Sequence, residues 1–411
     1  MEIRDRSLAQ AGIDKINWVT AYMPVLAKLE QELKAEGVFR GKRIAMSIHL
    51  EAKTARLALL LKNAGAEVAV TGCNPLSTQD DICAGLVELG LEVNAWYDAS
   101  PSEYERHLIN TLSIMPDVII DDGGDLVILL HGKYKALAEN LIGGCEETTT
   151  GIQRLCAREG DGCLDFPMLA VNNARCKHLF DNRYGTGQSS FDGIIRTTNL
   201  IIAGKTVVVA GFGWCGKGIA MRAKGLGAKV VITEIDSVKA IEAVMEGFEV
   251  MTMDEASTIG DVFITVTGCC DVIEKRHFSQ MKDGAILCNA GHFDSEINIL
   301  HLKELSTKIE KRRKNIVGYS LPSGNTVNLL AEGRLVNLAA ADGHPAEIMD
   351  MSFAIQALSL RHMLLEGPKM SRKVYEIPKE IDEKVAEIKL STLGIEVDKL
   401  TEAQEKYIKS F

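Results

Sequence analysis

Short runs of apolar residues alternate along the chain with longer segments in which apolar positions recur at helical spacing. In the first half, the apolar runs predict strands near 43–48, 67–71, 91–96, 117–121 and 167–171. Helical patterns lie between them, and residues 53–63 place Ala55, Leu59 and Leu60 on one face. Strands that alternate with helices in this way indicate an α/β fold built on a parallel sheet.

A second alternating series begins at residue 206, and its apolar runs predict strands at 206–211, 229–234, 261–268 and 284–291. The polar, glycine-rich stretch FDNRYGTGQSSFDG (180–193) separates the two series and predicts the crossover between two domains. After about residue 340 the pattern becomes helical. Residues 376–411 are charged and helix-prone with a short break at IEVDKLT, which favours a solvated arm or an oligomer contact over an independent domain.

Composition narrows the class of protein. The 411 residues are enough for two or three domains, and 46% hydrophobic with 25% charged residues exclude disordered and disulfide-scaffold classes. The net charge of −10 argues against nucleic acid or an anionic membrane as partner. No apolar run approaches the roughly 18 residues of a membrane span, and MEIRDRSLAQ lacks the apolar stretch of a signal peptide. Ten cysteines without a CxxC pair indicate reduced thiols and no metal site, so a cytoplasmic protein is expected.

The loop GFGWCG (211–216) is the strongest local signal, because it follows an apolar strand and opens a helix. Gly211 permits the tight turn, Gly213 lets the backbone approach a pyrophosphate, and Gly216 lets helix and strand pack closely. Glu234 ends the next strand, where a carboxylate accepts from both ribose hydroxyls and repels a 2′-phosphate. The pattern predicts NAD rather than NADP, although Lys239 tempers that exclusion. The alternative is an ordinary turn with packing glycines.

Polar residues follow the strands of the first half, where open α/β sheets bind ligands. His49 comes directly after RIAMSI, and its alternative is a structural histidine. The run DDGGD (121–125) follows another strand, and three carboxylates there are costly unless solvated, hydrogen-bonded or bound to a ligand. A carboxylate base with a tuned pKa is favoured over a metal ligand.

Two further clusters precede the crossover. EETTTG (146–151) is typical of a capped helix N-terminus, or of a hydroxyl row that binds ribose or cofactor. Lys177 and Asp181 share a helix face beside Asn182, which indicates either a surface ion pair or a lysine whose pKa is lowered beside a reacting hydroxyl. NAGH (289–292) and DGHP (342–345) are expected to face the interdomain cleft. No role is assigned to the remaining histidines: His107, His131, His178, His277, His301 and His362.

Together these residues resemble the S-adenosyl-L-homocysteine hydrolase family. The resemblance runs in family order from about 16 to 405 and is carried by HLEAKTA, NPLSTQDD, DDGGDL, EETTTG, KHLFDNRYGTGQS, GFGWCGKG, NAGHFD, LAEGRLVNL and GHP. It implies two doubly wound parallel-sheet domains with a helical C-terminal arm, assembled as a homotetramer. The implied parts are a substrate domain (1–183, completed by 343–375), an NAD-binding Rossmann domain (184–342) and an oligomerisation arm (376–411). One tightly held NAD per subunit would be regenerated in each turnover.

The resemblance also implies the reaction. NAD-dependent oxidation of the ribose 3′-hydroxyl would acidify the C4′ proton, homocysteine would leave by β-elimination, water would add at C5′, and the ketone would be reduced again. The catalytic residues would be His49 and His292 at C5′ and the homocysteine side, Asp122 at C4′, and Glu147, Lys177 and Asp181 at the ribose hydroxyls. Substrate would also contact Glu51, Lys53, Thr148, His344, Met349 and Phe353. Cofactor would contact Thr148, Thr149, Thr150, Asn182, Gly211, Gly213, Trp214, Cys215, Gly216, Glu234, Lys239, Thr267, Asn289, Ala290, Gly291 and Asn337.

Three departures from the family pattern matter. The chain ends at EKYIKSF, without the tail whose Lys and Tyr reach a neighbour's NAD site in long family members. Thr186 replaces a family cysteine near the nicotinamide. Lys53 replaces a residue that accepts from the purine 6-amino group, and a lysine only donates.

The third departure leaves the purine open. A mispaired buried donor costs about 1–3 kcal/mol, or about 5–150-fold, so a 6-oxo purine (inosine) is either tolerated or preferred. The alternative is that Lys53 turns outward or pairs with a carboxylate and adenine is bound through backbone groups. Two other classes stay open, an NAD-dependent dehydrogenase with net substrate oxidation and a non-catalytic NAD-binding sensor.

Overall fold

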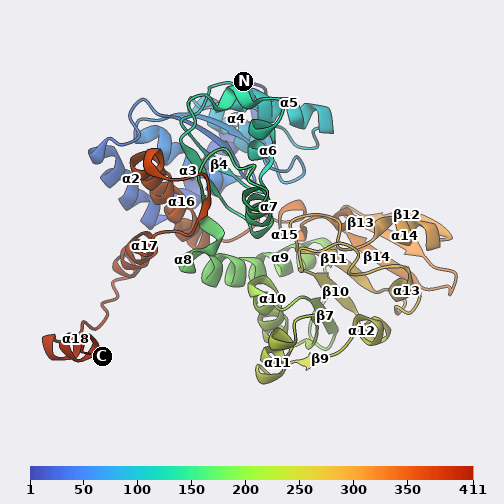
Figure 1. Ribbon diagram of the computed structural model, residues 1–411. Helices are drawn as coiled ribbons and strands as arrows, with labels where there is room; N and C mark the ends of the chain where they lie inside the picture. The colour runs from blue at the N-terminus through green and yellow to red at the C-terminus, as the bar shows by residue number, and fades with distance from the viewer. Residues whose placement is uncertain (411) are drawn as a thin grey trace.

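The computed structural model describes residues 1–410 and has two lobes, each a parallel or mainly parallel sheet between helices (Figure 1). The predicted α/β fold is confirmed. The central strands are buried on both faces, as strands enclosed by helices must be, and this is why they read as continuous apolar runs.

The first sheet is parallel throughout and has the order β15-β6-β5-β4-β1-β2-β3. Its strands are β1 (Arg43–Ser47), β2 (Glu67–Thr71), β3 (Glu92–Val93), β4 (Val118–Asp121), β5 (Gly143–Glu146), β6 (Met168–Ala170) and β15 (Val374–Tyr375). The pattern did not predict β5, whose sequence is GGCE. A Cβ on Gly144 would lie 2.4 Å from Cγ1 of Ile119, so close packing explains a glycine where an apolar residue is usual.

The second sheet has the order β12-β13-β14-β11-β10-β7-β8-β9 and is mixed at one edge, because β13 runs antiparallel to both of its neighbours. Its strands are β7 (Thr206–Ala210), β8 (Lys229–Thr233), β9 (Glu249–Val250), β10 (Val262–Thr265), β11 (Ile286–Asn289), β12 (Lys308–Arg313), β13 (Ile316–Ser320) and β14 (Thr326–Leu330). The strands at 308–330 were not predicted, since β12 is an exposed, charged edge strand without an apolar run.

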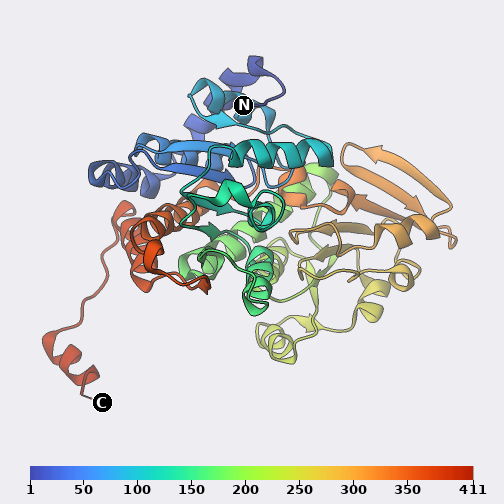
Figure 2. The same cartoon turned by 45° about the horizontal axis from the view of Figure 1, so that its top comes forward.

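Helices cover both faces of each sheet (Figures 1 and 2). Those of the first lobe are α1 (Ala9–Thr20), α2 (Pro24–Glu36), α3 (Ala52–Asn63), α4 (Asp80–Glu88), α5 (Pro101–Leu112), α6 (Asp125–His131), α7 (Thr149–Gly160), α8 (Arg175–Lys177), α16 (Ala346–Glu366) and α17 (Lys379–Thr392). Those of the second lobe are α9 (Thr186–Thr198), α10 (Trp214–Gly225), α11 (Ser237–Met245), α12 (Met253–Ile259), α13 (Lys275–Phe278), α14 (Ile299–Leu305) and α15 (Val336–Ala339).

Two segments join the lobes. The predicted crossover at 180–193 is helical, because a π-helix (His178–Gly185) runs directly into α9. It crosses α10 so closely that a Cβ on Gly218 would lie 1.7 Å from the carbonyl oxygen of Arg183. The chain returns through residues 340–345 into α16, which packs into the core of the first lobe against α2 and α3.

The C-terminal segment leaves the body of the molecule. After α17 the chain is exposed, and α18 (Glu402–Ile408) stands apart from both lobes (Figures 1 and 2). Within residues 1–410, no helix has the length and apolar character needed to cross a membrane. All ten cysteines are free thiols in the structure.

Candidate active site

A cavity of about 770 Å³ lies between the two lobes. Its first wall comes from the chain that follows β1, β4 and β5, and its second wall comes from the chain that follows β7, β10 and β11. The carboxyl ends of both sheets therefore face the same space, which is where open α/β sheets bind ligands. The crossover helix and the N-terminal half of α16 close the cavity.

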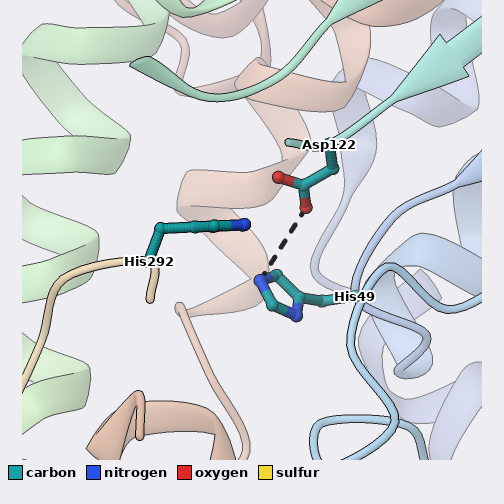
Figure 3. A group of neighbouring side chains, drawn as sticks. All are labelled: His49, Asp122 and His292. Atoms are coloured by element: carbon teal, nitrogen blue, oxygen red, sulfur yellow. Dashed lines mark ion pairs between the residues drawn. The ribbon is translucent and has the colours of Figure 1, made fainter. Parts of the chain in front are cut away.

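His49, Asp122 and His292 meet at one end of this cavity (Figure 3). The Nε2 atom of His49 lies 3.8 Å from Oδ2 of Asp122, and the two imidazole rings are 5.8 Å apart between centroids. Ser77 shares a 2.6 Å hydrogen bond with Nδ1 of His49, and the Cys73 thiol donates to Oδ2 of Asp122 at 3.3 Å. The other carboxylate oxygen of Asp122 is buried and has no partner among the described residues.

Burial lowers the pKa of His49 to about 4, although the nearby Asp122 carboxylate opposes that shift. A neutral imidazole beside a carboxylate is able to accept a proton and pass it on. Ligand atoms of the two histidines and Asp122 lie within 4.8 Å of one another, so the set would also fit a transition-metal ion. The absence of a metal site stays a prediction.

A buried cation forms the second cluster. The Nζ atom of Lys177 lies 3.3 Å from Oε1 of Glu147 and 3.4 Å from Oδ2 of Asp181, and it donates to Oδ1 of Asn182 at 2.9 Å. Gln356 donates to the second Glu147 oxygen at 2.5 Å. One ammonium therefore joins two carboxylates in a site that excludes most water.

The electrostatics of this cluster correct one expectation. Burial alone would lower the pKa of Lys177, but Asp181 and Glu147 raise it above its ordinary value, so the unliganded protein does not hold the lysine with a lowered pKa. Burial raises the pKa of Glu147 to about 7 against the opposing effect of Lys177. Lys177 and His344 hold the pKa of Asp181 below its usual range despite burial. The cluster thus offers one fixed anion, one cation and one carboxyl that titrates near neutrality.

His344 links the two crossover segments. Its Nδ1 lies 2.5 Å from Oδ1 of Asp181, and its Nε2 lies 3.3 Å from the Thr186 hydroxyl. That hydroxyl in turn contacts the Cys215 sulfur at 3.6 Å, so a thiol from the glycine-rich loop lies beside the position where the family's cysteine is replaced. Ser352 donates to the second oxygen of Asp181 at 2.7 Å.

Lys53 lies inside the cavity wall and is 5% exposed. Its ammonium contacts Oε2 of Glu51 at 2.5 Å and donates to the carbonyl oxygen of Asp342 at 2.6 Å. Glu51 caps α3 by accepting from the backbone N–H groups of Lys53 and Thr54. The side chain has therefore not turned outward, and the carboxylate pairing foreseen as the alternative is present.

The glycine-rich loop has the shape that a dinucleotide requires. Gly211 has φ +104°, a conformation that permits the tight turn. A Cβ on Gly216 would lie 2.0 Å from the carbonyl oxygen of Gly211, so Gly216 permits close packing of helix and strand. A Cβ on Gly213 would meet nothing within 4 Å, which leaves that backbone open to the cavity. The residues present fit the pyrophosphate of NAD at the N-terminus of α10.

Glu234 and the threonine row have structural partners. Glu234 accepts from the backbone N–H groups of Phe212 at 2.7 Å and of Ile235 at 2.8 Å, so its carboxylate fixes the loop. The Thr148 hydroxyl accepts from Gly151 N–H at 3.1 Å as the cap of α7, which confirms the capping interpretation. Thr149 accepts from the Asn172 side chain.

All but four of the predicted site residues line the cavity; the four that do not are Gly211, Gly216, Glu234 and Asn289. Asn289 is buried beneath the wall, where its amide accepts from Gly291 N–H and donates to the carbonyl of Phe293. Sequence reasoning missed the buried partners Cys73, Ser77, Asn172, Ser352 and Gln356. The signal for the last two was present, since both are polar positions among the mostly apolar residues that α16 buries.

Comparisons with known proteins agree with this geometry. Residues 1–135 match the family model described as S-adenosyl-L-homocysteine hydrolase, and residues 182–343 match the model of its NAD binding domain. The chain belongs to the S-adenosyl-L-homocysteine hydrolase family. The predicted family, the hydrolase class and the NAD cofactor are therefore confirmed.

Relatives within the family carry two different names. The chain is 55% identical to the S-inosyl-L-homocysteine hydrolase of Methanocaldococcus jannaschii, over 100% of this chain and 99% of that protein. It is 53% identical to the adenosylhomocysteinase of Pyrococcus abyssi, over 100% of this chain and 97% of that protein. It is 54% identical to the adenosylhomocysteinase of Thermotoga maritima, over 97% of this chain and 99% of that protein. Overall identity does not separate the two names, so the purine has to be argued from the site.

Proposed function

We propose that this protein catalyses the reversible hydrolysis of a purine-nucleosyl-L-homocysteine thioether and that S-inosyl-L-homocysteine is its preferred substrate. NAD, when bound, supplies the acceptor that makes the 3′-carbon a ketone and returns the hydride at the end of the cycle. The chain's own residues bind the ribose, hold the protons and exclude water. The observation that carries the choice of purine is the buried ammonium of Lys53.

At the ribose hydroxyls, the two carboxylates and the ammonium act together. Glu147 accepts from the ribose hydroxyls, and its pKa near 7 lets it take up and return a proton beside Lys177. The ammonium of Lys177, between Glu147 and Asp181, stabilises the 3′-oxygen while the hydroxyl proton passes to Glu147. Asp181 stays ionised and receives no proton permanently.

At C4′ and C5′, we assign a proton relay to Asp122 and His49. The unpartnered Oδ1 of Asp122 removes the C4′ proton, which a neighbouring ketone makes acidic. The neutral His49 imidazole, 3.8 Å from Oδ2, takes that proton and delivers it to the departing homocysteine sulfur as the C5′–S bond breaks. The reverse transfer activates water for addition at C5′. His292, whose ring lies 5.8 Å from that of His49, is proposed to assist at the homocysteine and water side.

The purine is proposed to lie against Lys53, as the family resemblance implies. An ammonium has three N–H groups, and two of them contact Glu51 and the Asp342 carbonyl. The acceptors at this end of the cavity are therefore already bonded, and the remaining group is a donor. A 6-oxo purine accepts from it, whereas a 6-amino group meets a second donor. The cost of that mispairing is about 1–3 kcal/mol.

Steady-state kinetics test this choice. We expect kcat/KM for S-inosyl-L-homocysteine to exceed that for S-adenosyl-L-homocysteine by about 5–150-fold, and Lys53→Gln to reduce or reverse the ratio. Lys217→Gln is the matched control, because Lys217 also lines the cavity but pairs with Glu242. Equal or higher kcat/KM for the adenosyl compound would refute inosyl preference while leaving the reaction intact. Net accumulation of NADH during turnover would instead favour the dehydrogenase alternative.

We also propose the domain boundaries, the assembly and the cellular compartment of the enzyme. Residues 1–183 and 343–375 form the substrate domain, 184–342 the cofactor domain, and 376–411 an arm for a homotetramer in the cytoplasm. Support for the arm comes from its exposed apolar residues Leu393, Ile395 and Val397. The acidic net charge is consistent with a small-molecule substrate and with no nucleic acid or membrane partner.

A further inference from the structure

Glu146 is a buried carboxyl group that the proposed reaction does not use. It ends β5, is fully buried, and precedes the ribose ligand proposed at Glu147. A single oxygen, Oε1, accepts from the backbone N–H of Gly123 at 2.9 Å, from that of Thr148 at 3.0 Å and from the Thr148 hydroxyl at 3.1 Å. One atom thus joins the loop that carries the base Asp122 to the loop proposed to meet the cofactor.

The second oxygen of Glu146 has no partner among the described residues and is buried. The charged groups that face it are the carboxyls of Asp121 and Asp122 at the end of β4, and these raise its pKa together with burial. Arg154 of α7 donates instead to the Gly123 carbonyl and to Asp125. The backbone N–H groups of Gly123 and Thr148 oppose the rise in the pKa of Glu146 that burial and the two carboxyls cause.

The fit around this carboxyl is close on the helix side. A Cβ on Gly151 would lie 2.1 Å from the Glu146 carboxyl carbon, so α7 can approach only with a glycine at that position. A side chain at position 151 would therefore displace the carboxyl group from the two loops. Its geometry is set by packing, and the loops are set by its hydrogen bonds.

We propose that Glu146 is a positioning residue that holds the base loop and the cofactor loop in register through its hydrogen bonds to Gly123 and Thr148. It touches neither substrate nor cofactor. Without its acceptor oxygen, Gly123 and Thr148 lose a shared anchor, and Asp122 moves away from the C4′ hydrogen while the ribose site is still able to bind and oxidise the nucleoside. This proposal rests on the proposed function.

The test compares two partial reactions of the NAD-loaded enzyme with added inosine. Absorbance of NADH reports 3′-oxidation, and uptake of solvent deuterium at C4′ reports removal of that proton. We expect Glu146→Leu to lower the ratio of C4′ exchange to 3′-oxidation at least tenfold, and Glu146→Gln, which keeps an acceptor oxygen and is neutral, to stay within about threefold of wild type. The stabilisation of the apoprotein by NAD, measured as a thermal shift, should also fall in Glu146→Leu only.

Asp350 supplies the matched control. It is another fully buried carboxyl that accepts two backbone N–H groups, those of Val25 and Leu26, away from the reacting residues. Asp350→Leu should lower the melting temperature yet leave the exchange-to-oxidation ratio unchanged. An unchanged ratio in Glu146→Leu, or a Gln variant as impaired as the Leu variant, would overturn the positioning role. A wild-type enzyme that showed neither NADH absorbance nor deuterium uptake at C4′ would overturn the proposed function itself.

Discussion

The side chain that concentrates most of the site's electrostatics is Lys177. Two carboxylates and one amide oxygen surround its ammonium, and burial leaves it 6% exposed. The prediction of an i, i+4 pair with Asp181 is confirmed, but the pair is buried and the pKa shift has the opposite sign to that expected. The spacing of Lys177 and Asp181 can be seen in the sequence, but Glu147 cannot: it approaches from the end of β5 and, together with Asp181, raises the pKa of the lysine against burial.

Lys177→Ala should abolish turnover, with a loss of at least about 100-fold, while the protein stays folded. Folding survives because Glu147, whose pKa is already about 7, takes up a proton, and Asp181 keeps its partners His344 and Ser352. Turnover should be measured with S-inosyl-L-homocysteine and folding by circular dichroism. Wild-type rates in Lys177→Ala would refute the role assigned to the lysine.

From the burial of Asp121 we predict that the free energy of unfolding depends on pH. Burial raises its folded pKa to about 8 from an ordinary value of 3.8, so the native state binds more protons than the unfolded state between these values. The free energy of unfolding should therefore fall as pH rises toward 8. His49 acts in the opposite direction, because its pKa is lowered to about 4 from 6.5, but that effect is complete by about pH 6.5.

Chemical denaturation of the apoprotein between pH 6.5 and 8.5 covers the range in which Asp121 and Glu147 titrate, and a variant separates the contribution of Asp121. Wild type should lose stability across this range, and Asp121→Asn should flatten the slope because an amide does not titrate. Asp165→Asn is the control, since Asp165 is a surface carboxyl whose pKa is lowered by its hydrogen bond to Lys135. A slope that is unchanged in Asp121→Asn would show that Asp121 is ionised throughout.

Among the helices and strands, the strands that consist of apolar runs were predictable, whereas the glycine-rich strand β5 and the glycine-rich crossover helix were not. The strands β1, β2, β4, β7 and β8 coincide with apolar runs because both of their faces are buried. By contrast, β5 is GGCE, because Ile119 and Met168 fill the space that side chains would take. The crossover is rich in glycine, which is usual for a loop, yet it is helical. Its glycines are explained by packing, because they let the crossover helix pass close to α10.

The glycine-rich loop allows a prediction that separates packing from cofactor contact. Gly216→Ala should destabilise the apoprotein by a large amount, because its Cβ would lie 2.0 Å from the Gly211 carbonyl. Gly213→Ala should leave apoprotein stability nearly unchanged, since its Cβ meets open space, but should weaken NAD binding at least tenfold. Thermal melts with and without NAD measure both. Equal NAD affinity in wild type and Gly213→Ala would place the pyrophosphate elsewhere.

At the scale of the whole molecule, the site exists only because distant segments meet. Lys53 bonds to the Asp342 carbonyl across 289 positions of sequence, and Gln356 reaches Glu147 across 209. Motifs placed these residues at strand ends and in a returning helix, so the list of site residues was largely predictable. The contacts between these residues were not predictable, because they depend on how α16 inserts into the first lobe. The anchoring roles of Glu146 and Asn289 were hidden for the same reason.

The second lobe and the arm each expose an apolar surface, and this predicts how copies assemble. Val238 and Ile241 on α11 are 73% and 60% exposed next to Lys239, which lines the cavity, while Leu393 and Ile395, 60% and 50% exposed, lie where α17 ends and the segment leading to α18 begins. A surface of this kind is stabilised when a second copy covers it. We expect deletion of residues 393–411, or the pair Val238→Glu and Ile241→Glu, to yield smaller assemblies in light scattering.

The same variants should release NAD faster, because α11 borders the cofactor side of the cavity and its cover would be lost. Ile309→Glu is the control: Ile309 is an exposed apolar residue on β12, at the far edge of the second sheet. It should leave both the assembly and the NAD release rate as in wild type. A chain that keeps its assembly state without residues 393–411 would show that contacts between the lobes, and not the arm, hold the copies together.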